Sequence, residues 1–487
     1  MKPDVLANNV YRVSAKIGSK DLFEGIWPIP NGVMLNSYVL KGSGKTVLID
    51  LVKDWDGACD AIETQMKMLS LTVSDIDVLV INHMEPDHTG SLASFVRKNP
   101  KVEIYCSDKS VPLIKAFYGV TRNVHAVKDG ETLDIGGKTL RFLLTPNVHW
   151  PETMMTFDEQ DGILFSCDAF GAYGRYDHCF HHELGDDERQ LLDSEMERYY
   201  ANIISSFSPF VLRAIKKLGD MKVDVRMVAP SHGVVWSEDH DRAIATYRRL
   251  AEYAIGSREK EITLVWSSMY GNTQALVETI SKAVESEGVK LDVFQVPQTH
   301  ASFVLEKAWR SEGLILGMPT YEYKMFPPMY AVLDILDRSH VNGRKIMRFG
   351  SFGWSGGAQK QFDEFVASMK LDCYGNVEYQ GYPTEEDRKK AFEMAKRLAH
   401  DIAIGRRLCI RGSGGERCEK RLHVVIRHHH RFRMPLDGKK KRPFVRLDCL
   451  RGSIGGTCDY RETRSDPMEN LVMKAVHLHR FPMKDIP

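Results

Sequence analysis

The amino-acid sequence predicts an α/β protein built from two successive parts and an irregular basic tail. In the first part, strand-like runs follow one another with helical segments on their flanks, which is typical of an αββα sandwich. From Glu261 onwards, strands and helices alternate at even spacing, which is typical of a doubly wound parallel sheet. The charge balance then changes, because residues 404 to 487 hold 20 Lys+Arg against nine Asp+Glu, whereas the whole chain has a net charge of +1.

The composition excludes several classes of protein. The chain has 487 residues, a length that is enough for two or three globular cores. Its 43% hydrophobic and 27% charged residues are typical of a globular protein. No run reaches the roughly 18 apolar residues that span a bilayer, and the N-terminal segment lacks the apolar core of a signal peptide. The nine cysteines are scattered rather than spaced as a disulfide framework. We therefore expect a cytoplasmic protein with no membrane contact.

The first part is expected to begin with a hairpin over residues 36–50, in which a glycine-containing turn joins two strand-like runs. Apolar periodicity predicts the elements that follow it. They are a helix over 55–69, a strand over 78–81, a helix over 90–98, a strand over 102–106, a helix over 110–118, strands over 138–145, 154–158 and 162–166, a long helix over 189–218 and a strand over 225–229.

Four side chains that can bind metal ions crowd the segment after the strand at 78–81. His83, Glu85, Asp87 and His88 lie within six consecutive positions, and Pro86 restricts how the loop can bend. Loops held by a rigid scaffold are common places for functional sites. A polar surface loop in which Asp87 caps a helix is the simpler alternative. Few structural demands call for such a cluster, however, so the segment indicates a metal site.

Three further candidate ligands each follow a predicted strand: His149, Asp168 and His232. Each of them alone would more often be an ordinary loop residue. Together with the cluster, they resemble the metallo-β-lactamase superfamily, whose signature is His-x-His-x-Asp-His followed by distant His, Asp and His.

One position departs from that signature, because Glu85 stands where the superfamily has its second histidine. A carboxylate is a harder ligand than an imidazole, so the exchange favours a redox-active pair of irons over zinc. Asp168 would bridge the two ions, since a carboxylate has two oxygens. Besides Asp168, the resemblance implies three ligands for each iron: His83, Glu85 and His149 for the first, and Asp87, His88 and His232 for the second.

Three loops of the second part each follow a buried strand, at 262–266, 313–317 and 345–350. The first loop is rich in small polar residues and precedes a helix over 275–287, so it can present N–H groups and hydroxyls to an anion. A capped helix without a ligand is the alternative for this loop taken alone. All three loops lie where ligands of open α/β sheets bind. Their candidate residues are Ser268, Met269, Tyr270, Gly271, Asn272, Thr273, Pro319, Thr320, Tyr321, Glu322, Ser351, Phe352, Gly353, Trp354, Ser355, Gly356 and Gly357.

These loops resemble those of flavodoxin, in which a phosphate loop and two loops flanking the isoalloxazine ring bind FMN. The sequence contains no GxGxxG motif, which argues against a dinucleotide. A helix over 384–403, with Gly405 at its C-terminal cap, is expected to close this part.

The two parts together resemble the flavodiiron proteins, or A-type flavoproteins, over roughly residues 5–404. The resemblance implies an FMN- and diiron-dependent oxidoreductase, with two non-haem iron ions that reduce dioxygen to water or nitric oxide to nitrous oxide. It also implies a head-to-tail homodimer or dimer of dimers. Its electron donor would be a rubredoxin, a reduced flavin or deazaflavin, or a reductase. We expect the diiron domain over residues 1–256 and the FMN domain over 257–405.

Tyr199 and Tyr200, on the long predicted helix, are candidates for the substrate side of the diiron site. Ordinary helix packing is the more common role for two such residues.

The tail over 406–487 shows no periodic apolar face. Some flavodiiron proteins carry a C-terminal rubredoxin, whose iron is held by two Cys-x-x-Cys pairs, but the four cysteines of the tail form no such pair. These are Cys409, Cys418, Cys449 and Cys458. We expect a degenerate rubredoxin-like remnant or a disordered segment. The alternative is a basic tail that binds nucleic acid through its positive charge, although no recognition module is evident.

Two other functions stay open at this point. One is a zinc-dependent hydrolase of the metallo-β-lactamase fold with a regulatory flavin domain, against which Glu85 and the three loops argue. The other is a non-catalytic redox sensor that carries flavin and iron and uses the tail to reach nucleic acid.

Overall fold

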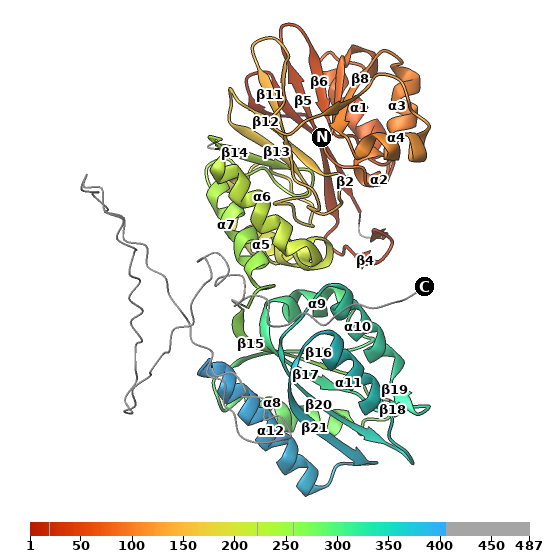
Figure 1. Cartoon of the computed structure of the whole chain (residues 1–487), viewed down its shortest axis with the longest axis vertical. Helices are drawn as coiled ribbons and strands as arrows, with labels where there is room; N and C mark the ends of the chain where they lie inside the picture. The colour runs from red at the N-terminus through yellow and green to blue at the C-terminus, as the bar shows by residue number, and fades with distance from the viewer. Residues whose placement is uncertain (19, 222, 257, 406–487) are drawn as a thin grey trace, which may run out of the picture. The chain divides into compact units, whose positions relative to one another are not determined.

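The computed structural model describes residues 1–405 except 19, 222 and 257, and all of these belong to one compact unit (Figure 1). The tail over 406–487, for which a rubredoxin-like remnant is predicted, lies outside the described residues. The division of the chain between residues 256 and 257 stays a prediction.

The first half of the chain contains two sheets. The strands of the larger sheet are, in spatial order, β1 (Asp4–Ala7), β2 (Val10–Ile17), β5 (Val33–Lys41), β6 (Thr46–Ile49), β7 (Val78–Ile81), β8 (Glu103–Ser107) and β9 (Val124–Val127). Neighbours are antiparallel from β1 to β6 and parallel from β6 to β9. Strand β7, in the parallel half of this sheet, leads directly into the loop that carries the candidate metal ligands.

The second sheet is mostly antiparallel, with one parallel pair at its edge. Its strands are, in spatial order, β10 (Thr132–Asp134), β11 (Thr139–Leu144), β12 (Met154–Asp158), β13 (Ile163–Cys167) and β14 (Met227–Pro230). The inner faces of the two sheets form a common apolar core. Within it, the rings of Tyr38 on β5 and Phe165 on β13 lie 5.0 Å apart between centroids.

Helices flank the two sheets, which confirms the predicted αββα sandwich. They are α1 (Ala58–Met68), α2 (Pro86–Thr89), α3 (Leu92–Lys98), α4 (Ser110–Tyr118), α5 (Asp186–Tyr199), α6 (Ser208–Asp220) and α7 (His240–Glu252), with short 3₁₀ turns η1 (Val73–Asp75) and η2 (His181–Glu183) and a small hairpin of β3 (Leu22–Phe23) and β4 (Trp27–Pro28). Helix α1 shows how the sequence sets this packing, because Ala58, Ile62 and Met66 recur every four residues and are buried on its inner face.

The single long helix predicted over 189–218 is wrong. After α5, the chain makes a π-helical turn, η3 (Tyr200–Ile204), and a 3₁₀ turn, η4 (Ser205–Phe207), before α6 begins. The Ser205 hydroxyl donates to the Ala201 carbonyl over 2.7 Å, and the Ser208 hydroxyl donates to the Ser205 carbonyl over 2.6 Å. Such bonds compete with the regular helical ladder, and Pro209 lacks an N–H to continue it.

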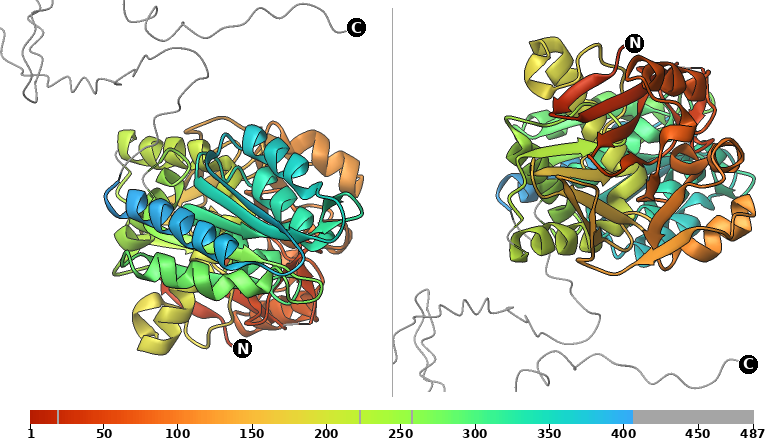
Figure 2. Two further views of the ribbon diagram at one scale, coloured as in Figure 1. Left: turned by 90° about the horizontal axis from the view of Figure 1, so that it is seen from below. Right: turned by 90° about the horizontal axis from the view of Figure 1, so that it is seen from above.

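The second half is a doubly wound parallel sheet, as predicted. Its strands are, in spatial order, β16 (Lys290–Gln295), β15 (Glu259–Trp266), β17 (Ser311–Gly317), β20 (Lys345–Phe352) and β21 (Asp372–Gln380), all parallel. Its helices are α8 (Val277–Glu285), after the 3₁₀ turn η5 (Gln274–Leu276), and α9 (Ala301–Arg310), α10 (Pro327–Arg338), α11 (Ala358–Ser368) and α12 (Glu385–Ala403). Helices α8 and α12 share one apolar core with one face of the sheet (Figure 2).

A buried arginine joins the two halves. Arg198, on α5, donates to the Pro28 carbonyl over 2.8 Å and to the Ser302 hydroxyl of α9 over 3.0 Å. Its charge is balanced by Glu195, which accepts from Nε over 3.0 Å. A buried charge is tolerated only when it is paired and hydrogen-bonded, so these contacts tie the sandwich to the parallel sheet.

Within residues 1–405, apart from the three gaps, no helix combines the length and the apolarity needed to span a bilayer. The five cysteines in the same part of the chain are free thiols.

Candidate metal centre and flavin site

The loop after β7 presents its polar side chains in a fixed order. His83 follows the strand, and Glu85 precedes α2 in an extended conformation. Pro86 occupies the first turn of α2, where its missing N–H costs no hydrogen bond. Asp87 and His88 therefore lie within a helical turn, close to His83.

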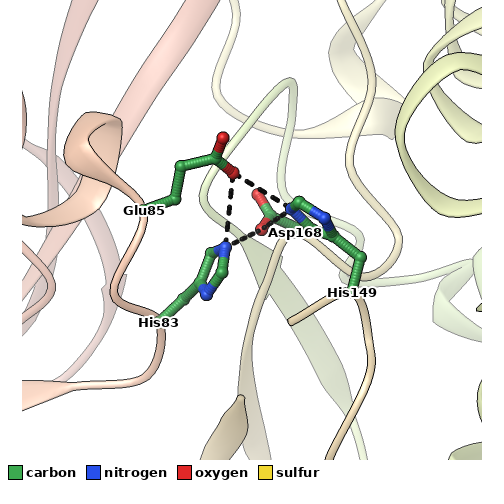
Figure 3. A group of neighbouring side chains, drawn as sticks. All are labelled: His83, Glu85, His149 and Asp168. Atoms are coloured by element: carbon green, nitrogen blue, oxygen red, sulfur yellow. Dashed lines mark hydrogen bonds and ion pairs between the residues drawn. The ribbon is translucent and has the colours of Figure 1, made fainter. Parts of the chain in front are cut away.

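Four side chains form a first donor group, in which they point toward one another from three separate segments (Figure 3). Nε2 of His149 lies 3.0 Å from Oε2 of Glu85, and Nε2 of His83 lies 3.3 Å from the same oxygen. Both imidazoles also approach Oδ2 of Asp168, at 3.5 and 3.4 Å. Two imidazoles and two carboxylates thus converge on one point.

A second donor group lies beside the first and consists of Asp87, His88 and His232. Nε2 of His232 lies 3.2 Å from Oδ2 of Asp87, and Nε2 of His88 lies 3.4 Å from it. Oδ1 of Asp168 is 3.0 Å from His88 and 3.2 Å from His232. Asp168 therefore offers one oxygen to each group. The structure brings all seven predicted ligands together, and their binding of metal stays a prediction.

Several buried atoms of the two groups lack a hydrogen-bond partner. They are both carboxylate oxygens of Asp87, Oδ2 of Asp168 and Nε2 of His232. Three of these four atoms, Oδ2 of Asp87, Oδ2 of Asp168 and Nε2 of His232, meet opposing side chains only at ion-pair distances of 3.2–3.5 Å, whereas buried polar atoms ordinarily have an aligned hydrogen bond. Two cations between the groups would satisfy these atoms, so the donor set fits a dinuclear metal centre.

Electrostatics in the metal-free cluster favour protonated histidines. Burial opposes the charged form of His149. Asp168 and Glu85 outweigh this effect through their hydrogen bonds and their negative charges, and they raise the pKa of His149 to about 10. Burial likewise opposes protonation of His232, yet Asp168 and Asp87 raise its pKa to about 9. Burial tends to raise the pKa of Glu85, but the neighbouring histidines lower it below its usual range. The carboxylates of the site thus carry negative charge that protons balance in the metal-free protein. Bound cations can replace these protons.

The ring nitrogens that face away from the cluster are also held. Nδ1 of His83 lies 2.7 Å from Oε1 of Glu152, and Nδ1 of His232 lies 2.8 Å from the Met34 carbonyl. Such outer partners fix the orientation of a ligating imidazole. The sequence analysis did not identify Glu152. The only available signal was its position in the segment His149-Trp-Pro-Glu, which does not name His83 as the partner.

The two tyrosine candidates have different surroundings. The Tyr199 hydroxyl donates to Oδ1 of Asp168 over 2.9 Å, so Tyr199 touches the cluster. The Tyr200 hydroxyl instead pairs with the Ser208 hydroxyl at 2.8 Å, and its ring packs edge-on against Tyr247. The structure therefore directs the Tyr200 hydroxyl at Ser208 within the helical region, and the role of Tyr200 at the substrate side stays a prediction.

The three predicted flavin loops meet at the carboxyl edge of the parallel sheet. The hydroxyls of Thr273 and Ser351 lie 3.4 Å apart, which links the first loop to the third. The Ala358 N–H donates to the Thr320 hydroxyl over 3.2 Å, which links the second loop to the start of α11, directly after the third loop. Gly350 is required between them, because a Cβ there would lie 1.8 Å from the Met318 carbonyl.

Aromatic side chains stand exposed on these loops. Tyr270 is 88% and Trp354 is 73% exposed, and Tyr321 is also exposed. Exposed aromatic rings grouped around polar loops are typical of a surface that a ligand covers. Together with the start of α8 behind the first loop, they fit a planar ring carrying a phosphate. The role of each loop residue stays a prediction.

Known proteins share this arrangement. Residues 33–233 match the family model described as ODP family beta lactamase. The anaerobic nitric oxide reductase flavorubredoxin of Aeromonas hydrophila subsp. hydrophila is 32% identical over 402 residues, which cover 82% of this chain and 79% of that protein. The flavorubredoxin of Aeromonas salmonicida is 35% identical, over 82% of this chain and 75% of that one.

Two solved structures agree along almost their whole length. Rubredoxin oxygen:oxidoreductase from Desulfovibrio gigas superposes with a TM-score of 0.78 at 25% identity, covering 83% of this chain and 99% of that one. The flavodiiron protein from Giardia intestinalis gives a TM-score of 0.77 at 26% identity, covering 83% and 97%.

A lactamase-type sandwich with two adjacent donor groups, joined to a flavodoxin-like sheet, defines an oxidoreductase with two kinds of redox cofactor. The chain belongs to the flavodiiron proteins, whose cofactors are FMN and a non-haem diiron centre.

Proposed function

We propose that this protein reduces dioxygen to water, nitric oxide to nitrous oxide, or both, with electrons that arrive through FMN. The observation that carries the proposal is Asp168, whose two oxygens face two separate groups of donors. The names of the relatives support the two candidate reactions, since one is a nitric oxide reductase and another a rubredoxin oxygen:oxidoreductase.

The proposed iron ligands divide as the sequence resemblance implies. His83, Glu85 and His149 would hold one iron, Asp87, His88 and His232 the other, and Asp168 both. When bound, the iron pair supplies redox electrons and open coordination positions for a diatomic gas. The protein contributes rigidity, because six of the seven ligands are buried and their positions are fixed by the ends of packed strands and by α2.

Tyr199 contributes a hydrogen-bond donor at a defined atom. Its hydroxyl directs a hydrogen bond at Oδ1 of Asp168, and burial raises its pKa well above the ordinary value, so that the proton is held. A phenol held in its neutral form orients the Asp168 carboxylate, which would hold both irons, without adding charge to the cluster.

The three loops at the carboxyl edge of the parallel sheet would hold FMN. Ser268 to Thr273 would bind the phosphate with N–H groups and hydroxyls at the start of the helical segment. Residues 319–322 and 351–357 would flank the isoalloxazine ring, with Tyr321 and Trp354 as the exposed aromatic rings.

Further features of the proposal rest on the family resemblance. We propose a cytoplasmic protein with a diiron domain over residues 1–256 and an FMN domain over 257–405. The assembly would be a head-to-tail homodimer or a dimer of dimers. The electron donor would be a rubredoxin, a reduced flavin or deazaflavin, or a reductase.

The test combines cofactor analysis with turnover. The purified full-length chain should contain about two irons and one FMN, and the reduced protein should consume dioxygen, nitric oxide or both catalytically. Zinc in place of iron, without gas consumption, would support the hydrolase alternative. A single stoichiometric oxidation, without turnover for either gas, would support the redox sensor.

A further inference from the structure

Three histidines of the cluster direct their second ring nitrogen at chemically different partners. His83 meets a carboxylate, Oε1 of Glu152, at 2.7 Å. His232 meets the Met34 carbonyl at 2.8 Å, and His88 lies 3.8 Å from Sγ of Cys167. Among these three contacts in the described part of the chain, only that of His83 is to a group that is ordinarily an anion.

Glu152 is committed to this contact. Its side chain is buried, and the same Oε1 also accepts the Met84 N–H over 3.0 Å. Its other oxygen has no hydrogen-bond partner. Because Nδ1 of His83 is held by Glu152, Nε2 is the nitrogen left to bind a metal ion, and it faces Glu85 and Asp168.

This contact makes the two donor groups unequal in their outer hydrogen bonds. The first group contains Glu85 and receives the influence of Glu152 through the His83 ring. The second group contains Asp87, and the outer ring nitrogens of its histidines meet the Met34 carbonyl and the Cys167 sulfur. The Asp50 carboxylate lies near His88 but accepts its hydrogen bonds from Asn82. Asp168 is shared between the groups. An imidazole hydrogen-bonded to a carboxylate is a stronger electron donor to a metal than one hydrogen-bonded to a neutral group.

We propose that Glu152 is a positioning residue that differentiates the two metal positions of the protein. Through His83, it makes the position formed by His83, Glu85 and His149 the tighter one and the one with the lower reduction potential. The iron at the position of Asp87, His88 and His232 is then the more easily released and the more easily reduced. This inference rests on the proposed function, because it requires both positions to hold iron.

The test is the rate at which a ferrous chelator removes iron from the reduced holoprotein. Wild-type protein should lose its iron in two phases of equal size. Glu152→Gln keeps the shape of the side chain and an acceptor for both N–H groups but removes the charge. It should accelerate the slow phase by roughly 10- to 100-fold, the usual effect of losing such an outer partner, and leave the fast phase unchanged.

A second readout separates electronic influence from loss of structure. The lower of the two iron reduction potentials should rise in Glu152→Gln, whereas the higher one should stay in place. Glu152→Asp keeps the charge on a shorter side chain and should fall between wild type and Glu152→Gln in both measurements. It also provides the test if Glu152→Gln does not accumulate as folded protein.

Cys167→Ser is the matched control, because Cys167 lies beside His88 of the other group. It should leave the slow phase unaltered. FMN content should be unchanged in every variant, since the flavin loops lie on the parallel sheet.

The outcomes distinguish the inference from the proposed function. A wild-type protein that does not hold two irons contradicts the proposed function. A wild-type protein with two irons whose release and potentials are unaffected by Glu152→Gln contradicts the inference alone. Equal acceleration of both phases also overturns it, because that result would mark a general loosening of the site.

Discussion

The Tyr199 hydroxyl donates a hydrogen bond to Oδ1 of Asp168 over 2.9 Å, and both side chains are buried. Hydrogen bonds to charged groups contribute roughly 1.5–3 kcal/mol. Tyr199→Phe should therefore lower the free energy of unfolding of the metal-free protein by about that amount, measured by urea denaturation. Tyr200→Phe is the control, since it loses only a bond to the Ser208 hydroxyl, worth about 1 kcal/mol. Equal losses in the two variants would contradict the special role of Tyr199.

Removal of the metal should make stability depend on pH. In the metal-free cluster, the pKa of His149 is raised to about 10 and that of His232 to about 9, whereas an unfolded histidine titrates near 6.5. A raised pKa stabilises the folded state below the unfolded value, and this contribution is lost as pH rises through the folded value. The free energy of unfolding of chelator-treated protein should thus fall between about pH 6.5 and pH 10.

Iron affinity should rise over the same range of pH, because iron must displace protons from these histidines. Competition with a chelator of known pH dependence measures this change. A metal-free protein whose stability does not change over this range would show that the two histidines are neutral without metal.

Asp168→Ala should remove the carboxylate that faces both donor groups. We expect iron content to fall below two per chain, because both positions lose a ligand, while FMN remains bound by loops on the parallel sheet. Metal analysis and flavin absorbance measure the two quantities. Asp177→Ala is the control, since Asp177 forms an ion pair with Lys16 at the surface. A variant that keeps two irons and full activity would refute the ligand assignment.

Glu85→His should shift the site toward zinc. The substitution replaces a hard carboxylate by an imidazole, the ligand that zinc sites of this fold prefer. The zinc-to-iron ratio of the purified variant should rise and gas consumption should be lost. If the variant still purifies with iron and turns over, ligand hardness does not determine the choice of metal.

Truncation after Gly405 should leave iron, FMN and activity with a chemical electron donor unchanged. Helix α12 buries Ala391, Ala395, Leu398 and Ile402 in the core of the parallel sheet, so this half is already closed. The full-length chain should also lack rubredoxin-type absorption, because its tail has no Cys-x-x-Cys pair. Loss of both cofactors on truncation, or a third iron in the full chain, would show that the tail is a folded and necessary part of the protein.

Local patterns in the sequence predicted the elements that carry the site. The apolar run at 78–81 is strand β7, and the predicted strands at 313–317 and 345–350 lie within β17 and β20. Periodicity failed between α5 and α6, where apolar residues continue through a segment that side-chain hydrogen bonds and Pro209 interrupt.

The partners of the cluster could not be predicted in the same way. Glu152 is 69 positions from His83, and Met34 is 198 positions from His232. A sequence pattern reports which face of an element is buried, but not which distant group will meet it there. The tyrosine pair shows the same limit, because adjacent residues at the end of one helix point to different surroundings.

The guanidinium of Arg198 has a consequence for how the molecule unfolds. It is hydrogen-bonded by three acceptors at once. Glu195 and the Pro28 carbonyl belong to the sandwich, and Ser302 belongs to α9 of the other half. If the parallel sheet opened alone, α9 would withdraw and leave a buried cation short of one acceptor. Partial opening is therefore penalised at the junction, and the two halves should lose their structure in a single cooperative transition rather than as independent modules.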